Sequence, residues 1–196
     1  MFGSMSRLLA LAAASTAFLN VAVAGQDRIA VKEARLVRGL VDARTRVPGG
    51  PVSPPAESVF LWVRLEIATA VKLPMDIELL KAEAADTSGQ SFKIIGLSPY
   101  NDAEPVVRFI WEPVSRGGSQ VSDVTDLVTT HGAGDFPSFE LNKRGPIEKQ
   151  SAKLTIKKTP AIFSLFFVVP AKAGLFQVKG LSPTPLTTGR LVLPGG

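Results

Sequence analysis

The sequence contains no cysteine and only one histidine among 196 residues. The absence of cysteine excludes disulfide scaffolds, cysteine-ligated zinc, iron–sulfur clusters, thiol nucleophiles and a lipid anchor on an N-terminal cysteine. His131 has no second imidazole to complete a metal site, and the nearby Asp123, Asp126 and Asp135 lack the spacing of a calcium loop. We therefore expect His131 to be a solvated loop residue, and we expect no metal ion and no other cofactor.

Motifs for nucleophilic catalysis and phosphate binding are missing as well. The chain has no G-x-S-x-G, and the Gly-rich residues 129–135 lack the G-x-G-x-x-G order. Carboxylates are the only abundant acid–base groups that remain. The enzyme hypothesis is therefore a secreted hydrolase that uses a pair from Asp123, Asp126, Asp135 and Glu140.

Long hydrophobic runs are confined to the N-terminus. Arg7, the apolar residues 8–19 and the small-x-small pattern of Ala22 and Ala24 match a signal peptide of residues 1–24, cleaved before Gly25. A buried core helix and a retained anchor are the alternatives. No later stretch reaches the length of a membrane span, so we expect an exported, periplasmic or extracellular protein without a transmembrane segment in the mature chain.

In the mature chain, apolar side chains most often recur at every second residue. Residues 58–69 place Val59, Leu61 and Val63 on one face and Phe60 and Trp62 on the other, as in a β-strand. We expect Phe60 and Trp62 to be covered, with an exposed aromatic pair as the alternative. Trp111 and Tyr100 would suit a carbohydrate-stacking platform on loops.

Two hairpins are predicted. Residues 79–85 and 91–97 flank a turn in which Gly89 is available for a positive φ, although residues 75–85 also have the composition of a helix that begins after Pro74. Residues 161–169 are apolar on both faces and predict a central strand whose second face lies under a loop, with residues 115–137 as the candidate. Residues 175–180 are expected to pair with that strand as a returning edge strand.

These patterns predict one all-β domain, an antiparallel β-sandwich of about seven strands over residues 25–181. Residues 182–196 are expected to trail along the surface, with an edge strand at residues 191–193 as the alternative. The turn DTSGQSF and the ending FFVVPAKAGLFQVKGL resemble the small immunoglobulin-like sandwich domains of bacterial secreted proteins. The resemblance implies an extracellular or cell-envelope interaction module and carries no catalytic residues.

Charge is distributed unevenly along the chain. Residues 76–140 carry four basic and eleven acidic side chains, whereas residues 141–196 carry nine and one. The basic residues Lys143, Arg144, Lys149, Lys153, Lys157 and Lys158 meet only Glu148 within their segment, and a second basic run comprises Arg28, Lys32, Arg35, Arg38, Arg44 and Arg46. This charge pattern is explained without a binding partner if these residues lie on a solvated sheet face, where lysines protect a sheet edge against further pairing.

The functional interpretation of the first run is a basic face for an anionic cell-envelope component or an acidic protein, with the second run as its other rim. Nucleic acid is not expected, because aromatic residues are not interleaved with the cations. The leading hypothesis is thus an exported, non-enzymatic binding module that uses loops or this basic face. The carboxylate hydrolase and an assembly protein that associates through a sheet edge are the alternatives.

Overall fold

The computed structural model describes residues 29–43, 52–69, 72–112, 114–116, 119–121, 127–130 and 132–195. Within these ranges the chain forms β-strands and a single short 3-10 turn, η1 (Ile147–Lys149). No helix in these ranges has the length and hydropathy of a membrane span. The prediction of an all-β, mainly antiparallel fold is confirmed, whereas the predicted signal peptide, residues 1–24, lies outside the described residues.

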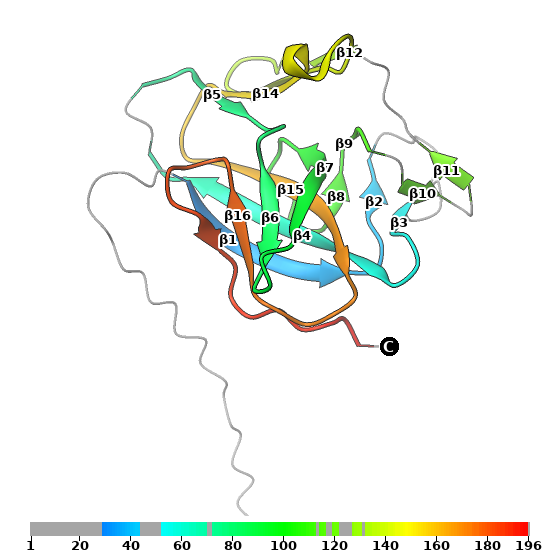
Figure 1. The fold of residues 1–196 in the computed structure, drawn as a ribbon. Helices are drawn as coiled ribbons and strands as arrows, with labels where there is room; N and C mark the ends of the chain where they lie inside the picture. Colours follow the sequence, from blue (N-terminus) through cyan, green and yellow to red (C-terminus); the bar gives the residue numbers. More distant parts are fainter. Residues whose placement is uncertain are drawn as a thin grey trace, which may run out of the picture.

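An eight-stranded sheet forms the centre of the fold (Figure 1). Its strands, in spatial order, are β1 (Ile29–Val37), β4 (Ser58–Ile67), β15 (Ala161–Pro170), β7 (Ser91–Ser98), β6 (Glu83–Asp86), β16 (Phe176–Lys179) and β17 (Leu186–Thr187), with β9 (Phe109–Ile110) paired to β7. The sheet curves so that β17 comes within 8 Å of β1 although the two strands do not pair. The half that contains β6 and β16 consequently crosses in front of β1 and β4 (Figure 1).

A four-stranded sheet covers one end of the large sheet (Figure 1). Its strands, in spatial order, are β12 (Leu127–Thr130), β13 (Ser138–Asn142), β14 (Ser151–Ile156) and β5 (Met75–Glu78). The remaining strands are β11 (Ser119–Val121), β10 (Val114–Arg116) and β3 (Val52–Ser53), which form a small sheet, and the parallel pair β2 (Val41–Asp42) and β8 (Val106–Val107).

Strand β15 is buried on both faces, as its sequence predicts. Phe163, Leu165 and Phe167 point into the main core, which also receives the inner face of the four-stranded sheet. Phe166, on the opposite face, packs in a second core with Phe60. Among the described residues, Leu40, Val52, Val107 and Ile110 cover that face, from the short strands β3, β8 and β9 and the bridge at Leu40. Most side chains of the predicted cover, residues 115–137, lie outside the described part of the chain.

The first predicted hairpin is confirmed, and the helical alternative for residues 75–85 is wrong. Strands β6 and β7 pair across a turn in which Gly89 has a φ of 85°. The Asp86 carboxylate accepts hydrogen bonds from the backbone N–H groups of Ser88 and Gln90 at 2.9 and 3.1 Å, which fixes the turn. Residues 75–78 instead form β5, which pairs with β14 in the other sheet.

The second predicted hairpin is wrong. Strand β15 pairs with β4 and β7, and β16 pairs with β6 and β17. A strand with two apolar faces is stabilised best between two neighbours, and both positions beside β15 are already occupied. Strand β16 therefore lies inside the sheet rather than at its edge, and Phe176 is fully buried in the main core.

The C-terminal segment that follows residue 181 packs on the large sheet. Residues 182–195 contribute β17, and Leu186 and Leu191 are buried in the main core. The segment is attached by the buried Thr188, whose hydroxyl accepts a hydrogen bond from the N–H of Phe176 at 3.0 Å, and by the backbone bridge between Gly174 and Leu191. Apolar side chains spaced along this proline-rich segment hold it against the sheet.

The burial of the side chains predicts which substitutions by alanine destabilise the fold most. We expect Phe167→Ala and Phe176→Ala each to lower the free energy of unfolding by roughly 3–5 kcal/mol, the usual cost of removing a large core aromatic. Ile147→Ala is the control, because that side chain is 82% exposed. Thermal and urea unfolding measure the differences; an unchanged melting temperature for Phe176→Ala would show that β16 is not an interior strand.

Candidate functional site

Half of the six basic residues predicted to form one face are paired with carboxylates in the structure. The Lys143 ammonium lies 2.9 Å from Glu112, Lys153 lies 3.5 Å from Glu140 and 3.8 Å from Asp76, and Lys158 lies 2.8 Å from Asp135. Lys157 donates a hydrogen bond to the carbonyl of Gly132 at 2.8 Å. Arg144, Lys149 and Lys157 are the members with no acidic partner among the described residues, and Arg144 and Lys149 are exposed.

The reason is the antiparallel pairing of the four-stranded sheet. The acid-rich residues 76–140 supply β5 and β13, and the base-rich residues 141–196 supply β14 between them. Lys153 stands opposite Glu140 in β13 and opposite Glu78 in β5. Segments of opposite charge in the sequence thus become neighbours in space, which favours their pairing.

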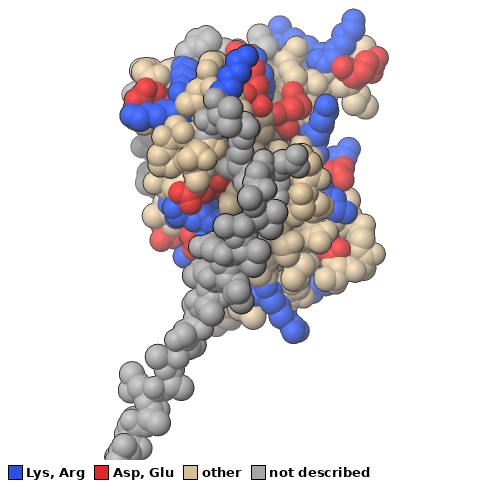
Figure 2. Space-filling model, turned by 90° about the vertical axis from the view of Figure 1, so that its left-hand side faces the viewer, with Lys and Arg blue, Asp and Glu red and all other residues tan. Residues whose placement is uncertain are grey.

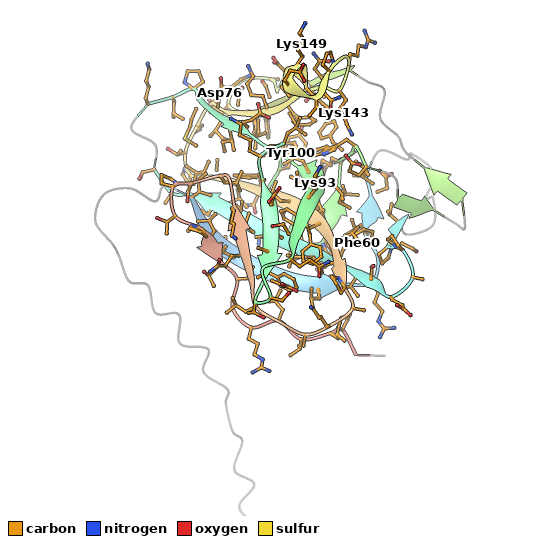
Figure 3. All side chains as sticks on the ribbon, in the orientation of Figure 1. Phe60, Asp76, Lys93, Tyr100, Lys143 and Lys149 are labelled. Atoms are coloured by element: carbon orange, nitrogen blue, oxygen red, sulfur yellow. The ribbon has the colours of Figure 1, made fainter. Side chains whose placement is uncertain are left out.

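The surface views agree with this pairing. Figure 2 shows Lys and Arg side chains beside Asp and Glu over the visible face, without a large area of one sign. Figure 3 shows Lys149 pointing away from the ribbon at the end opposite the C-terminus. The long-range attraction for an anionic partner is therefore weaker on this face than the sequence suggests.

The carboxylates of the hydrolase hypothesis are not gathered at one place among the described residues. Asp135 and Glu140 are each paired with a lysine, and Glu140 does not line the pocket that Asp135 borders. Asp123, Asp126 and His131 lie outside the described residues. In the part of the chain that the structure describes, no group of three or more His, Asp or Glu side chains is arranged to hold a metal ion.

The aromatic residues divide into core and surface. Phe60 and Trp62 are fully buried, so the prediction that they are covered is confirmed. Trp111 is also buried and stacks on Phe139 with ring centroids 5.9 Å apart, so it is not part of a carbohydrate platform. Phe136, which the sequence analysis did not single out, is 60% exposed.

Phe136 and Tyr100 form one wall of an open pocket between the two larger sheets, which we call the aromatic pocket. Their rings meet edge to face, with centroids 6.1 Å apart. The cavity has a volume of about 210 Å³. It is lined by Pro99, Tyr100 and Asn101 after β7, by Asp135, Phe136 and Pro137 before β13, and by Lys158, Pro160, Ala161 and Ile162 at the start of β15.

A charged network beneath Tyr100 holds this wall in place. Asp102 accepts two hydrogen bonds from the Arg108 guanidinium, at 2.9 and 3.2 Å, and a third from the Ser98 hydroxyl. The Arg108 guanidinium carbon lies 4.8 Å from the centroid of the Tyr100 ring. Figure 3 shows Tyr100 where the large sheet approaches the four-stranded sheet. The network therefore links the loop after β7 to the residues that follow β8.

Hydrogen bonds fix the charge states of Asp102 in this network and of Lys158 on the rim of the pocket. Partial burial opposes ionisation of Asp102, but the hydrogen bonds from Arg108 and Ser98 outweigh it and lower the pKa of its carboxyl. The hydrogen bond to Asp135 raises the pKa of Lys158 above its ordinary value. Asp102 and Lys158 are therefore charged at neutral pH, and the pair Asp135–Lys158 adds no net charge to the rim of the pocket.

The sequence contained part of this site. Lys158 and Asp135 were candidates for other roles, a basic face and a carboxylate pair, and Tyr100 was a candidate for a loop platform. Phe136 has a local signal, since it is a lone aromatic between Gly134-Asp135 and Pro137-Ser138 in a turn-rich stretch. The three lining segments come together because the two larger sheets pack against each other, and no local sequence pattern predicts that packing.

Comparison of the chain with protein-family models, with curated proteins and with solved structures gives no match. The resemblance to immunoglobulin-like sandwich domains therefore stays a prediction.

The Asp102 network generates a pH-dependent prediction. We expect Asp102→Asn to lower the free energy of unfolding at neutral pH by roughly 1–2 kcal/mol, because hydrogen bonds to a charged group are lost. The folded pKa lies below the ordinary 3.8, so this stabilisation is present above that value and is lost as the pH falls through the folded pKa. The difference between the two proteins should therefore shrink below about pH 4.

Urea unfolding at a series of pH values measures the difference. Glu104→Gln is the matched control, because Glu104 is an exposed acid in the same loop without a side-chain partner among the described residues. A difference for Asp102→Asn that does not vary with pH would contradict the ionised network.

Proposed function

We propose that this chain is an exported, non-enzymatic binding module of the cell envelope and that it binds through its loops, at the aromatic pocket. Export rests on the signal-peptide pattern of residues 1–24. Of the two surfaces considered from the sequence, the loops are favoured over the basic face, because most of the six cations have partners within the chain.

The observation that carries the proposal is the exposure of Phe136 in a supported pocket. A large aromatic side chain left 60% exposed loses the stabilisation that burial would give it. Its neighbour Tyr100 is held by Arg108, which is itself held by Asp102. An exposed aromatic on a preorganised wall is the usual composition of a binding site, because little ordering remains to be done when a ligand arrives.

The size and charge of the pocket indicate its ligand. About 210 Å³ is below the usual range for a whole drug-sized molecule, so the pocket takes a single ring. The rim carries a carboxylate on Asp135, an ammonium on Lys158 and an amide on Asn101, which together donate and accept hydrogen bonds without net charge. We propose a neutral, hydroxyl-bearing ring, a pyranose unit of an envelope glycan, stacked against Phe136.

Substitution of Phe136 tests the site. We expect Phe136→Ala to weaken binding of neutral hexosides by about fivefold, since one aromatic contact contributes on the order of 1 kcal/mol. Isothermal titration calorimetry with methyl hexosides and with isolated envelope polysaccharide measures the affinity, and thermal unfolding checks the fold. Ile147→Ala is the matched control, because Ile147, in η1, is another exposed large apolar residue and does not line the pocket. Equal affinities for the two variants would refute the site.

Processing tests the export part separately. We expect the protein recovered from the cell envelope or medium to begin at Gly25, because the sequence before it ends in the pattern that signal peptidase recognises. Intact-mass measurement of the exported protein detects the cleavage. A chain that retains Met1 would contradict the predicted signal peptide without bearing on the pocket.

A further inference from the structure

A second cavity lies along the edge of the large sheet and is independent of the aromatic pocket. It has a volume of about 580 Å³ and runs between the second half of β1 and the C-terminal segment. Its lining comprises residues 34–37 on one side and residues 190–195 on the other. We call it the edge groove; Figure 1 shows the segments on its two sides, with the C-terminal segment running below β1.

One wall of the edge groove is an unpaired strand edge. Strand β1 is the first strand of the large sheet and pairs with β4 alone. In an antiparallel strand, alternate residues direct their N–H and C=O groups to opposite sides, so half of these groups in β1 face away from β4. Among the described residues, no backbone group of residues 34–37 bonds to any segment other than β4.

The first half of β1 is protected against further pairing, whereas the second half is not. A register shift between Val31 and Glu33 interrupts the ladder, and the exposed Lys32 pairs with Glu66 at 3.2 Å. Bulges and charges of this kind keep an edge strand from recruiting another chain. Residues 34–37 follow the shift in regular register with β4 and carry no such protection apart from Arg35.

The opposite wall is fixed and apolar. Leu191 is held to Gly174 by two backbone hydrogen bonds of 2.7 and 3.1 Å, and the Arg38 guanidinium donates to the Pro194 carbonyl at 3.4 Å. Val192 and Leu193 are 75% and 40% exposed and are two of the most exposed large apolar residues described. Both line the groove, so its wall offers alternating apolar contacts to a chain laid along β1.

The charge of the edge groove is positive. Arg35 and Arg190 line it, and Arg38 lies at its end. Arg35 is paired with Glu33, but Arg38 and Arg190 have no carboxylate partner among the described residues. Unlike Lys143, Lys153 and Lys158, these two are available to an external anion.

We propose that the edge groove binds an extended, acidic segment of a partner protein, which adds to β1 as a strand. The backbone of residues 34–37 supplies the ladder, Val192 and Leu193 contact apolar side chains of the segment, and Arg38 and Arg190 pair with its carboxylates. Strand addition obtains affinity from main-chain hydrogen bonds and specificity from alternate side chains, and the edge groove contains the groups for both.

Fluorescence anisotropy with a labelled peptide of alternating aspartate and valine tests the proposal on the full chain. We expect saturable binding, at least tenfold weaker with asparagine in place of aspartate because two charge-assisted pairs are lost. The double variant Arg38→Glu and Arg190→Glu should abolish binding. The matched control, Arg144→Glu with Lys149→Glu, reverses two equally unpaired cations at the other end of the molecule and should leave the affinity unchanged.

A backbone readout separates strand addition from mere charge attraction. A peptide with N-methyl groups on alternate residues should lose binding, and hydrogen exchange at residues 34–37 should slow when the unmodified peptide is bound. Unchanged exchange, or equal binding of the methylated peptide, would overturn the proposal. Concentration-dependent dimers that protect the same amides would also overturn it, since they would identify a second copy of this chain as the occupant.

Discussion

The fold depends on the burial of β15 on both faces. This strand lies between β4 and β7, and its phenylalanines enter two separate cores, Phe163 and Phe167 on one side and Phe166 on the other. A strand with two apolar faces requires cover on each, so the four-stranded sheet and the curved half of the large sheet pack on one side and the short strands on the other. The aromatic pocket is lined by segments that adjoin strands of both larger sheets.

The second constraint is electrostatic. An acid-rich stretch precedes a base-rich stretch in the chain, and the pairing of β13, β14 and β5 brings the two together. Lys143, Lys153 and Lys158 each find a carboxylate that is distant in sequence. A surface that would be strongly basic in an extended chain is therefore nearly balanced, and individual exposed pairs of this kind contribute little to stability. Their effect is on recognition, because they remove the field that would attract an anion.

What remains for recognition lies at two separate places. The aromatic pocket combines an exposed ring with a rim of no net charge. The edge groove combines the unpaired outer edge of β1 with two arginines, Arg38 and Arg190, that lack carboxylate partners among the described residues. The two sites favour different chemistry, a neutral ring in one case and an acidic extended chain in the other. A module with both features would join a glycan to a protein, and each contact is open to measurement without the other.

The sequence by itself determined the all-β class, the double-faced strand at residues 161–169, the burial of Phe60 and Trp62 and the first hairpin, because these follow from alternation and turn chemistry within a few residues. It did not determine the partner of β16, the docking of the C-terminal segment or the neutralisation of the lysines. Those features depend on which segments, far apart in the chain, become neighbours. Only tertiary structure decides this, since strand pairing and charge pairing are set by the burial of the whole core rather than by local propensity.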